Sequence, residues 1–491
     1  MRILVLNPPF KPRFSRTSRS PAVSKGGCVY YPIWLAYATG VLHEAGHKVK
    51  LVDAPAENLS LEEVLGIAKE FKPKMVVLDT STASIHSDIM VAEALKKQSK
   101  CFTVLVGTHV SAMPEWALKE GKSIDAVCIK EYDYTLRDLA GELSKKNPAL
   151  EKVKGIAWRK KTKIKINELR PLIENLDELP FVSKVYKEFL GQKNYFYPAN
   201  LFPEITIVSG RGCPYRCTFC LLPQTLFSRA YRTRSIPNVI EEIKYILKEF
   251  PETKEIFFED DTFTANRHRV KEFCNAVQKE GLKFTWSANA RADVDLETLM
   301  AMKQAGCRLL CVGVESGEQK ILNDIHKGTR VEGIAMFMKD AKKAGILVHG
   351  CFILGNQGET KETIRKTIDF AKRLDPDTAQ FFPIMVYPGT EAFDYFKEKG
   401  FLTTTDFSQW VNEEGSHNTI VSRPGLSNEE LVGFCDLGRR EFYIRPKYIG
   451  KKLVQGLTSP KEIPRLAKAS GTLFKYLVRG TKQPEKKQAK K

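Results

Sequence analysis

Residues 205–220 read ITIVSGRGCPYRCTFC, and this stretch decides the fold of the chain around it. Its first part, Ile205–Ser209, is a short apolar run typical of a buried strand. A loop rich in glycine and proline follows and carries Cys213, Cys217 and Cys220 within eight residues. Three thiolates on one short loop can converge on the same metal centre. We therefore expect a strand that runs directly into a metal-binding loop.

The spacing of these cysteines favours an iron–sulfur cluster. A [4Fe–4S] cluster normally has four protein ligands, so three cysteines leave one iron open for a substrate or cofactor. Structural zinc also needs four ligands, and no His or Cys nearby in the sequence is an obvious fourth. The other eight cysteines are scattered, and we expect packed thiols rather than ligands. They are Cys28, Cys101, Cys128, Cys274, Cys307, Cys311, Cys351 and Cys435.

The region from residue 201 to 400 alternates apolar runs with helical patterns. This alternation predicts a partial (β/α)6 barrel, in which functional residues lie at the carboxyl ends of the strands. The expected strands are Ile205–Ser209, Glu255–Phe258, Lys283–Ser287, Leu309–Val314, Leu347–Leu354 and Thr378–Met385. The expected helices are Pro237–Lys248, Arg267–Lys279, Leu296–Lys303, Lys320–Asn323, Val331–Lys343 and Lys361–Arg373.

Residues 1–145 show the same alternation and predict a doubly wound, Rossmann-like parallel sheet of the α/β class. Pro8 and Pro9 stand where a dinucleotide-binding loop would need glycines, and the chain has no GxxxxGK[ST] loop, which argues against NAD and FAD. The expected strands are Ile3–Leu6, Val49–Val52, Met75–Leu78, Thr103–Val106 and Ala126–Ile129. The expected helices are Trp34–Ala45, Leu61–Phe71 and Asp88–Gln98.

Two further regions complete the organisation. Residues 146–200 form a connector, with a basic hairpin at 155–167 and a turn-rich segment at 176–180. Residues 401–491 form a mostly helical C-terminal region that ends in a basic tail. The chain has a net charge of +19, and residues 445–491 hold 14 Lys and Arg against two Glu. This tail either meets phosphate groups or is a solvated, frayed end.

The chain shows no sign of crossing or leaving a membrane. It has no apolar run of about 18 residues, and its N-terminus has no secretory cleavage site. Its eleven cysteines, an odd number, fit reduced thiols in the cytoplasm. The basic amphipathic segment Lys461–Arg479 favours peripheral contact with the inner membrane face. The alternative is a helix packed on the barrel with a charged outer face.

The CxxxCxxC pattern, with Phe219 before its last cysteine, resembles the signature of the radical S-adenosylmethionine superfamily. The resemblance implies that the methionyl amino and carboxylate groups of S-adenosylmethionine bind the open iron. A donor such as flavodoxin or ferredoxin supplies an electron to the cluster. Electron transfer from the cluster then yields a 5′-deoxyadenosyl radical. This radical abstracts hydrogen from an unactivated carbon.

An acidic segment at the end of the second barrel strand also resembles the family. Glu259, Asp260 and Asp261 correspond to the position that holds the methionyl amine, and carboxylates suit an ammonium group. The alternative is a solvated helix N-terminus with acidic caps.

Later strand ends match the family's cofactor loops. Ser287 and Arg291 share one strand face, and Arg291 either pairs with the cofactor carboxylate or with Asp293. Glu315 would bond a ribose hydroxyl or a polar substrate. Gly355 and Glu359 resemble the segment near the adenine, although residues 356–357 read Asn-Gln where relatives often have Leu-Pro.

The order of the two α/β regions is similar to the cobalamin-binding branch of the superfamily. That branch includes class B radical methyltransferases, the anaerobic magnesium-protoporphyrin ester cyclase and hopanoid-modifying enzymes. The base-off DxHxxG motif is absent, and we interpret His109 as a loop hydrogen-bonder rather than a cobalt ligand. The resemblance implies that cobalamin contacts Asn7, Pro8, Thr80, Ser81, Gly107, His109 and Ser111.

These features predict a radical enzyme that methylates, oxidises or rearranges a small molecule, and the basic C-terminus favours a lipid or isoprenoid. A tRNA methylthiotransferase is one alternative, but it needs a second three-cysteine cluster, and Cys28, Cys101 and Cys128 are widely spread. A cobalamin- or redox-sensing regulator is another, although a sensor has no need to cleave S-adenosylmethionine. We do not expect nucleic acid as a partner.

Overall fold

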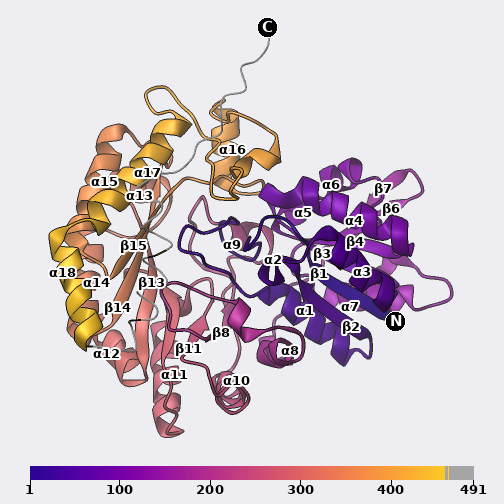
Figure 1. Cartoon of the computed structure of the whole chain (residues 1–491), viewed down its shortest axis with the longest axis horizontal. Coiled ribbons are helices and arrows are strands. Elements are labelled where there is room, and N and C mark those ends of the chain that lie inside the picture. The colour runs from indigo at the N-terminus through magenta and orange to yellow at the C-terminus, as the bar shows by residue number, and fades with distance from the viewer. Residues whose placement is uncertain (459–462, 464–470, 472–491) are drawn as a thin grey trace.

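The computed structural model describes residues 1–458, 463 and 471. Figure 1 shows two α/β units side by side, with the N-terminal sheet on one side and the later strands on the other. The C-terminal helices lie on the outer side of the second unit. The arrangement confirms the predicted fold class.

The first unit is built on a parallel sheet whose strands begin within one residue of their predicted starts. The order β2-β1-β3-β4-β5 reverses direction between β1 and β3, which is where doubly wound sheets bind ligands. The strands are β1 (Arg2–Asn7), β2 (Lys48–Asp53), β3 (Met75–Thr80), β4 (Phe102–Gly107) and β5 (Ala126–Cys128). The helices are α1 (Ile33–Glu44), α2 (Ala54–Glu57), α3 (Leu61–Phe71), α4 (Ile85–Ser99), α5 (Thr108–Ala112), α6 (Pro114–Glu120) and α7 (Asp133–Leu143).

The basic hairpin of the connector extends this sheet. Strands β6 (Ile156–Lys160) and β7 (Lys163–Ile166) are antiparallel, and β6 pairs with β5. The first sheet therefore has seven strands and is mixed rather than wholly parallel. The lysine-rich outer strand suits an exposed edge, because charged side chains discourage pairing with another chain.

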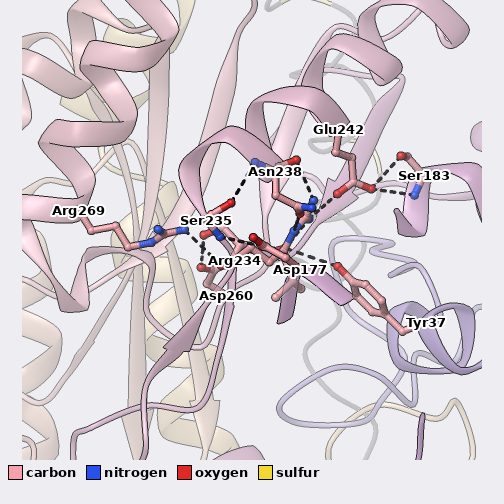
Figure 2. A network of polar contacts seen from close by, with 11 residues as sticks. Tyr37, Asp177, Ser183, Arg234, Ser235, Asn238, Glu242, Asp260 and Arg269 are labelled. Atoms are coloured by element: carbon pink, nitrogen blue, oxygen red, sulfur yellow. Dashed lines mark hydrogen bonds and ion pairs between the residues drawn. The ribbon is translucent and has the colours of Figure 1, made fainter. Parts of the chain in front are cut away.

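A buried carboxylate fixes the rest of the connector to the second unit. Glu242 of α10 (Ile236–Glu249) is fully buried and accepts hydrogen bonds from the backbone nitrogen and hydroxyl of Ser183, at 3.0 and 2.8 Å. Ser183 belongs to the connector helix α8 (Val182–Phe189). Arg234 also donates to Glu242 and to the carbonyl of Val208. Figure 2 shows this network, which joins the connector, a barrel helix and the end of the first barrel strand.

The second unit confirms the predicted partial barrel. All six strands are parallel, in the order β15-β14-β13-β12-β11-β8. They are β8 (Glu204–Ile207), β11 (Glu255–Phe258), β12 (Trp286–Ala290), β13 (Cys307–Glu315), β14 (Leu347–Leu354) and β15 (Thr378–Pro383). Besides α10, the helices are α9 (Leu221–Thr225), α11 (Arg267–Lys279), α12 (Leu296–Gln304), α13 (Gln319–Asp324), α14 (Val331–Ala344) and α15 (Lys361–Leu374). A two-stranded ribbon of β9 (Gly210–Arg211) and β10 (Arg232–Thr233) flanks the cysteine loop.

The third barrel strand starts three residues later than predicted, whereas the other strands start within two residues of their predictions. The third strand was expected at Lys283–Ser287, but pairing with β11 begins only at Trp286, opposite Ile256. The strand then continues to Ala290, so the polar residues after it lie closer to the strand end than the sequence pattern indicated.

The C-terminal region is mostly helical, as predicted. It contains α17 (Asn428–Tyr443) and α18 (Pro446–Thr458), and α16 (Glu391–Glu398) directly precedes it. Helix α17 closes the open edge of the barrel, because the Tyr443 hydroxyl donates to the carbonyl of Ala379 at 2.7 Å and accepts from its nitrogen at 3.0 Å. No helix within the described part of the chain is long and apolar enough to cross a bilayer. The predicted amphipathic segment Lys461–Arg479 falls outside the described residues, apart from 463 and 471.

Candidate active site

A cavity of about 1080 Å³ lies where the three parts of the chain meet. Its walls come from the barrel interior, from the long loop between β1 and α1, and from α17 and α18. All three cysteines of the CxxxCxxC loop line it. A single cavity is therefore shared by the predicted metal loop, the barrel strands and the C-terminal helices.

The cysteine loop has the geometry of a cluster site. Gly212, at φ +83°, precedes the first cysteine, and a Cβ there would lie 2.2 Å from the carbonyl of Ala230, so only glycine fits. Among the described residues, no group of three ligand atoms within 4.8 Å includes Cys213, Cys217 or Cys220. Thiolates around one zinc ion lie closer together than thiolates on separate irons of a cube. The spacing therefore fits a [4Fe–4S] cluster better than zinc.

The electrostatics of the loop favour thiolates only when a cationic centre lies among them. Burial raises the pKa of Cys220 well above its ordinary value, and the neighbouring Asp261, Cys217 and Cys213 raise it further. Three adjacent thiolates beside a carboxylate are unfavourable unless positive charge lies among them. Iron supplies that charge, so the donor set fits the cluster.

The acidic segment after β11 divides into supporting and cavity-facing side chains. Asp260 is fully buried and accepts hydrogen bonds from the nitrogen and hydroxyl of Ser209, at 2.7 and 2.6 Å. Asp261 lines the cavity and accepts from the nitrogen of Gly212 through Oδ2. Its other oxygen, Oδ1, is buried, makes no hydrogen bond within the described protein and lies 3.8 Å from the Arg19 guanidinium. Asp261 is thus the carboxylate with an oxygen available for an ammonium ligand.

Arg19, which we did not single out in the sequence, joins the first unit to this acidic segment. Its guanidinium donates to the Glu259 carboxylate and, at 2.7 Å, to the carbonyl of Asp260, and it lies 3.8 Å from Asp261. Asn289 also donates to Glu259, at 3.0 Å. Glu259 is therefore held by two protein partners, while Arg19 and Asn289 line the cavity.

The polar residues of β12 face different surroundings. Ser287 is fully buried and donates to Asn200 at 3.0 Å, away from the cavity wall. Arg291 lines the cavity, pairs with Asp293 at 3.0 Å, and lies 3.6 Å from the centre of the Tyr215 ring. Arg291 therefore forms the ion pair with Asp293 that was the alternative to pairing with the cofactor carboxylate.

Glu315 lies on the cavity wall with a cation that the sequence did not reveal. Lys327 donates to its carboxylate at 2.7 Å, and both side chains are buried. Glu315 also adopts a positive φ of 66°, a strained backbone for a residue with a side chain. The pair places one positive and one negative group beside the cysteine loop.

The side chain of Glu359 holds the loop from Gly355 to Glu359 in place. The Glu359 carboxylate accepts hydrogen bonds from the nitrogens of Gly355 and Asn356, the second at 2.8 Å. Gly355 has a φ of +99° and packs against Leu431 of α17. Neither Gly355 nor Glu359 lines the cavity.

Glu359 gives a testable pH dependence. Burial raises its pKa from 4.5 to about 7. Between those values the folded chain binds a proton that the unfolded chain has released, so stability falls as the pH rises through this window. Each pKa unit corresponds to about 1.4 kcal/mol.

As the pH rises from about 5 to 7, we therefore expect the unfolding midpoint of Glu359→Gln to fall less than that of the parent, because an amide does not titrate there. The measurement is the unfolding midpoint at several pH values. Glu362→Gln, an exposed change three residues later in α15, is the control and should retain the parental slope. Equal slopes for the parent and Glu359→Gln would contradict this assignment.

The carboxyl edge of the first sheet holds the residues that we expected to contact cobalamin. Asn7 donates to Asp53 at 2.7 Å and accepts from Arg16, which also donates to the carbonyl of Pro8. Thr80 donates to the carbonyl of Val106 at 2.7 Å. Ser81 shares a hydrogen bond with Ser84, and Ser111 accepts one from the nitrogen of Lys130. Most of these polar groups therefore organise the loops.

Two buried polar atoms at this edge have no hydrogen-bond partner within the described protein: the Thr108 hydroxyl and Nε2 of His109. His109 Nδ1 hydrogen-bonds to Thr82 at 3.2 Å, and burial lowers the pKa of His109 to about 3. Gly107 has a φ of +112°, and a Cβ there would lie 2.4 Å from the carbonyl of Thr80, so only glycine lets this loop pack against the end of β3. The two unsatisfied polar atoms fit the polar tail of a bound cofactor.

Comparison with known proteins agrees with this geometry. The Radical SAM superfamily model matches residues 207–371, and the B12 binding domain model matches residues 19–140. The chain is 32% identical over 457 residues to an uncharacterized methyltransferase of Pyrococcus horikoshii, covering 93% of this chain and 95% of the relative. The chain belongs to the B12-binding radical SAM family. Its cofactors are a [4Fe–4S] cluster, S-adenosylmethionine and cobalamin.

Other members of the B12-binding radical SAM family differ in their reactions. The anaerobic magnesium-protoporphyrin IX monomethyl ester cyclase of Cereibacter sphaeroides is 28% identical, over 84% of this chain and 67% of the relative. The hopanoid C-3 methylase of Methylococcus capsulatus is 24% identical, over 77% of this chain and 70% of the relative. A radical S-adenosylmethionine methyltransferase from Kitasatospora setae has the same fold, with a TM-score of 0.69 and 15% identity over 89% of this chain and 88% of that one.

The structure also bears on the tRNA methylthiotransferase alternative. Cys101 and Cys128 are buried in the first unit, whereas Cys28 packs near Tyr197. Each of the three belongs to a different hydrophobic cluster within the described part of the chain, so they do not lie together. The second cluster that this alternative requires therefore has no site among them.

The loop between β1 and α1 is the main feature that sequence reasoning missed. It supplies Arg16 and Arg19, and it spans residues 8–32. Connections between a strand and the next helix are usually two to six residues, and much longer ones are often functional. Its length was the signal that could have identified it.

Proposed function

We propose that this family member methylates an unactivated carbon of a lipid or isoprenoid substrate that enters the cavity past α18. When bound, the cluster and S-adenosylmethionine supply the radical that activates the substrate, and cobalamin supplies the methyl group. A small-molecule substrate and an electron donor are both consistent with the family. The observation that supports this substrate class is the apolar rim of the cavity.

That rim is a stripe on α18. Ile449, Leu453 and Leu457 recur every four residues, so they lie on one face of the helix. Their side chains line the cavity and yet are 47%, 66% and 84% exposed. Exposed apolar side chains at the mouth of a deep cavity suit a substrate whose body is hydrocarbon.

The same helix supports contact with a membrane surface. Lys447 and Lys451 lie on the other side of α18 from the stripe and pair with Asp375 at 3.8 and 4.0 Å, while Lys447 stays largely exposed. A helix with an apolar face and a basic polar face binds anionic membrane surfaces. We propose a cytoplasmic enzyme that meets the inner membrane face through α18 and takes its substrate from there.

Within the cavity, we propose that Phe219, Asp261, Arg291 and Glu315 contact S-adenosylmethionine, because these four line the wall that holds the three cysteines. Asp261 would accept from the methionyl amine through Oδ1. Glu259, Asp260, Ser287, Gly355 and Glu359 would hold the surrounding loops in place through the hydrogen bonds described above. At the facing sheet edge, Asn7, Pro8, Thr80, Ser81, Gly107, His109 and Ser111 remain our proposed cobalamin residues.

The test is mass spectrometry of lipids and polar metabolites from cells with and without the protein. We expect a lipid that gains one CH2 unit when the protein is present. A lipid that loses two hydrogens would instead support anaerobic oxidation, the reaction class suggested by the cyclase relative. A change confined to polar metabolites would contradict the proposed substrate class.

The membrane contact gives a second prediction. We expect Leu453→Glu combined with Leu457→Glu to weaken binding to phosphatidylglycerol vesicles by at least about tenfold, since burying each leucine contributes roughly 1.5–3 kcal/mol. The measurement is co-sedimentation of the full chain with vesicles. Met300→Glu with Met336→Glu is the matched control, because these residues are exposed on other barrel helices, outside the cavity wall. Equal binding by both double variants would refute the role of α18.

A further inference from the structure

A second group of metal-binding side chains meets on the barrel wall, outside the cysteine loop. Cys311 lies on β13, and His349 and Cys351 lie on β14. One ligand atom from each lies within 4.8 Å of the others, and this is the sole such group among the described residues. All three side chains line the cavity. We had expected both cysteines to be separate packed thiols.

The strand register explains why they meet. Strands β13 and β14 are parallel neighbours, with Cys311 opposite His349 and Gly313 opposite Cys351. Residues two apart on a strand share a face, so His349 and Cys351 both point to the side where Cys311 points. Glycine at 313 leaves the position beside Cys351 without a side chain. The three ligands are thus presented by rigid strands rather than by a loop.

Their spacing suits one tetrahedral ion. The two sulfur atoms are 3.9 Å apart. Thiolates bound tetrahedrally at 2.3 Å from zinc lie about 3.8 Å apart, so an ion could be accommodated with little movement. This contrasts with the CxxxCxxC loop, whose thiols are spread too widely for one ion.

Neighbouring groups hold the ligands in the manner of a metal site. His349 Nδ1 hydrogen-bonds to the Thr378 hydroxyl at 2.7 Å, and the Tyr197 hydroxyl lies 3.2 Å from the Cys311 sulfur. Metal-binding histidines usually bond a second partner through their other ring nitrogen, which orients the ring.

We propose that Cys311, His349 and Cys351 bind one zinc-class divalent ion, with a fourth position open to the cavity. Sites with three protein ligands and one open position are those in which zinc contacts a water or an oxygen donor of a bound molecule. The ion would therefore anchor a polar oxygen group of whatever occupies the cavity. This assignment stands independently of the substrate class proposed above.

The test uses the full chain, reconstituted anaerobically with iron and sulfide, then incubated with Zn²⁺ under a non-chelating reductant and desalted. We expect about one zinc per chain beside about four iron. Cys351→Ser and Cys311→Ser should lose the zinc but keep the iron, whereas Cys217→Ala should lose the iron but keep the zinc. Cys435→Ser is the matched control, because Cys435 lines the same cavity outside the group and its variant should keep both metals.

A second measurement does not depend on how well the serine variants fold. Co²⁺ bound in place of zinc should give a thiolate-to-cobalt charge-transfer band in the Cys217→Ala chain. Thr378→Val should weaken this binding by about ten- to a hundredfold, the usual effect of losing an outer hydrogen bond to a ligating histidine. Absence of the band, or equal zinc in the parent and in Cys311→Ser with Cys351→Ser, would overturn the proposal.

Discussion

Cys217→Ala should abolish both the iron–sulfur cluster and the formation of 5′-deoxyadenosine. Only three cysteines of the CxxxCxxC loop are available to hold the cube, and one iron must stay open for S-adenosylmethionine. Loss of one thiolate leaves two protein ligands at a site where burial raises the pKa of the remaining Cys213 and Cys220 thiols. We therefore expect the cluster to be lost rather than altered.

The measurement is iron and sulfide content after anaerobic reconstitution, together with 5′-deoxyadenosine produced from S-adenosylmethionine and a reductant. The parent should hold about four iron and four sulfide per chain with a broad visible absorbance, and the variant should show background values of all of them. Cys274→Ala removes a buried thiol of α11 outside the cavity, and it should leave the iron content unchanged. A Cys217→Ala chain that retained four iron would refute the ligand assignment.

The cluster loop could be predicted because all of its information is local. Three cysteines within eight residues, Gly212 before them and an apolar strand in front lie in one stretch of sequence. The same holds for the strands, since buried parallel strands are short apolar runs whose limits are visible without a partner. Strand β12 is the exception, because its start depends on the register with β11 rather than on its own apolar residues.

The rest of the site depends on contacts across long sequence separations. Arg19 reaches Glu259 from 240 residues away, and Cys311 meets Cys351 across 40 residues of barrel. Neither contact leaves a periodic signal, because the pairing of strands and the path of a long loop decide them. His349 illustrates the point, since as one histidine in a strand pattern it gave no reason to expect two cysteines beside it.

Residue type alone also did not distinguish the side chains that face the cavity from those that support it. Asp260 and Asp261 are adjacent and equally acidic, yet Asp260 binds Ser209 within the core, whereas Asp261 faces the cavity. Successive residues at a strand end point in different directions, so one shift of register reverses their roles. Position at a strand end therefore predicts a candidate, and the hydrogen-bond partners identify what it contacts.

The second large effect concerns stability and the sheet edge where we propose that cobalamin binds. Arg16 and Asp88 form an ion pair at 2.6 Å, and both side chains are completely buried. Arg16 also bonds Asn7 and the carbonyl of Pro8, so this pair holds the loop after β1. Removing one partner leaves the other charge buried and unpaired, which typically costs about 3–5 kcal/mol. We expect Arg16→Met to destabilise the first unit by this amount.

Urea unfolding followed by intrinsic fluorescence and circular dichroism measures the change, and a cobalamin titration by absorbance reports the state of the loop. The double change Arg16→Met with Asp88→Leu should recover most of the stability, because neither charge of the pair is left unpaired. It should not recover cobalamin affinity, because Asn7 and Pro8 lose their shared donor. Lys119→Met breaks an exposed pair with Glu115 and should alter stability by less than about 1 kcal/mol. Full recovery of cobalamin affinity in the double variant would show that Arg16 acts through charge balance alone and does not position the loop.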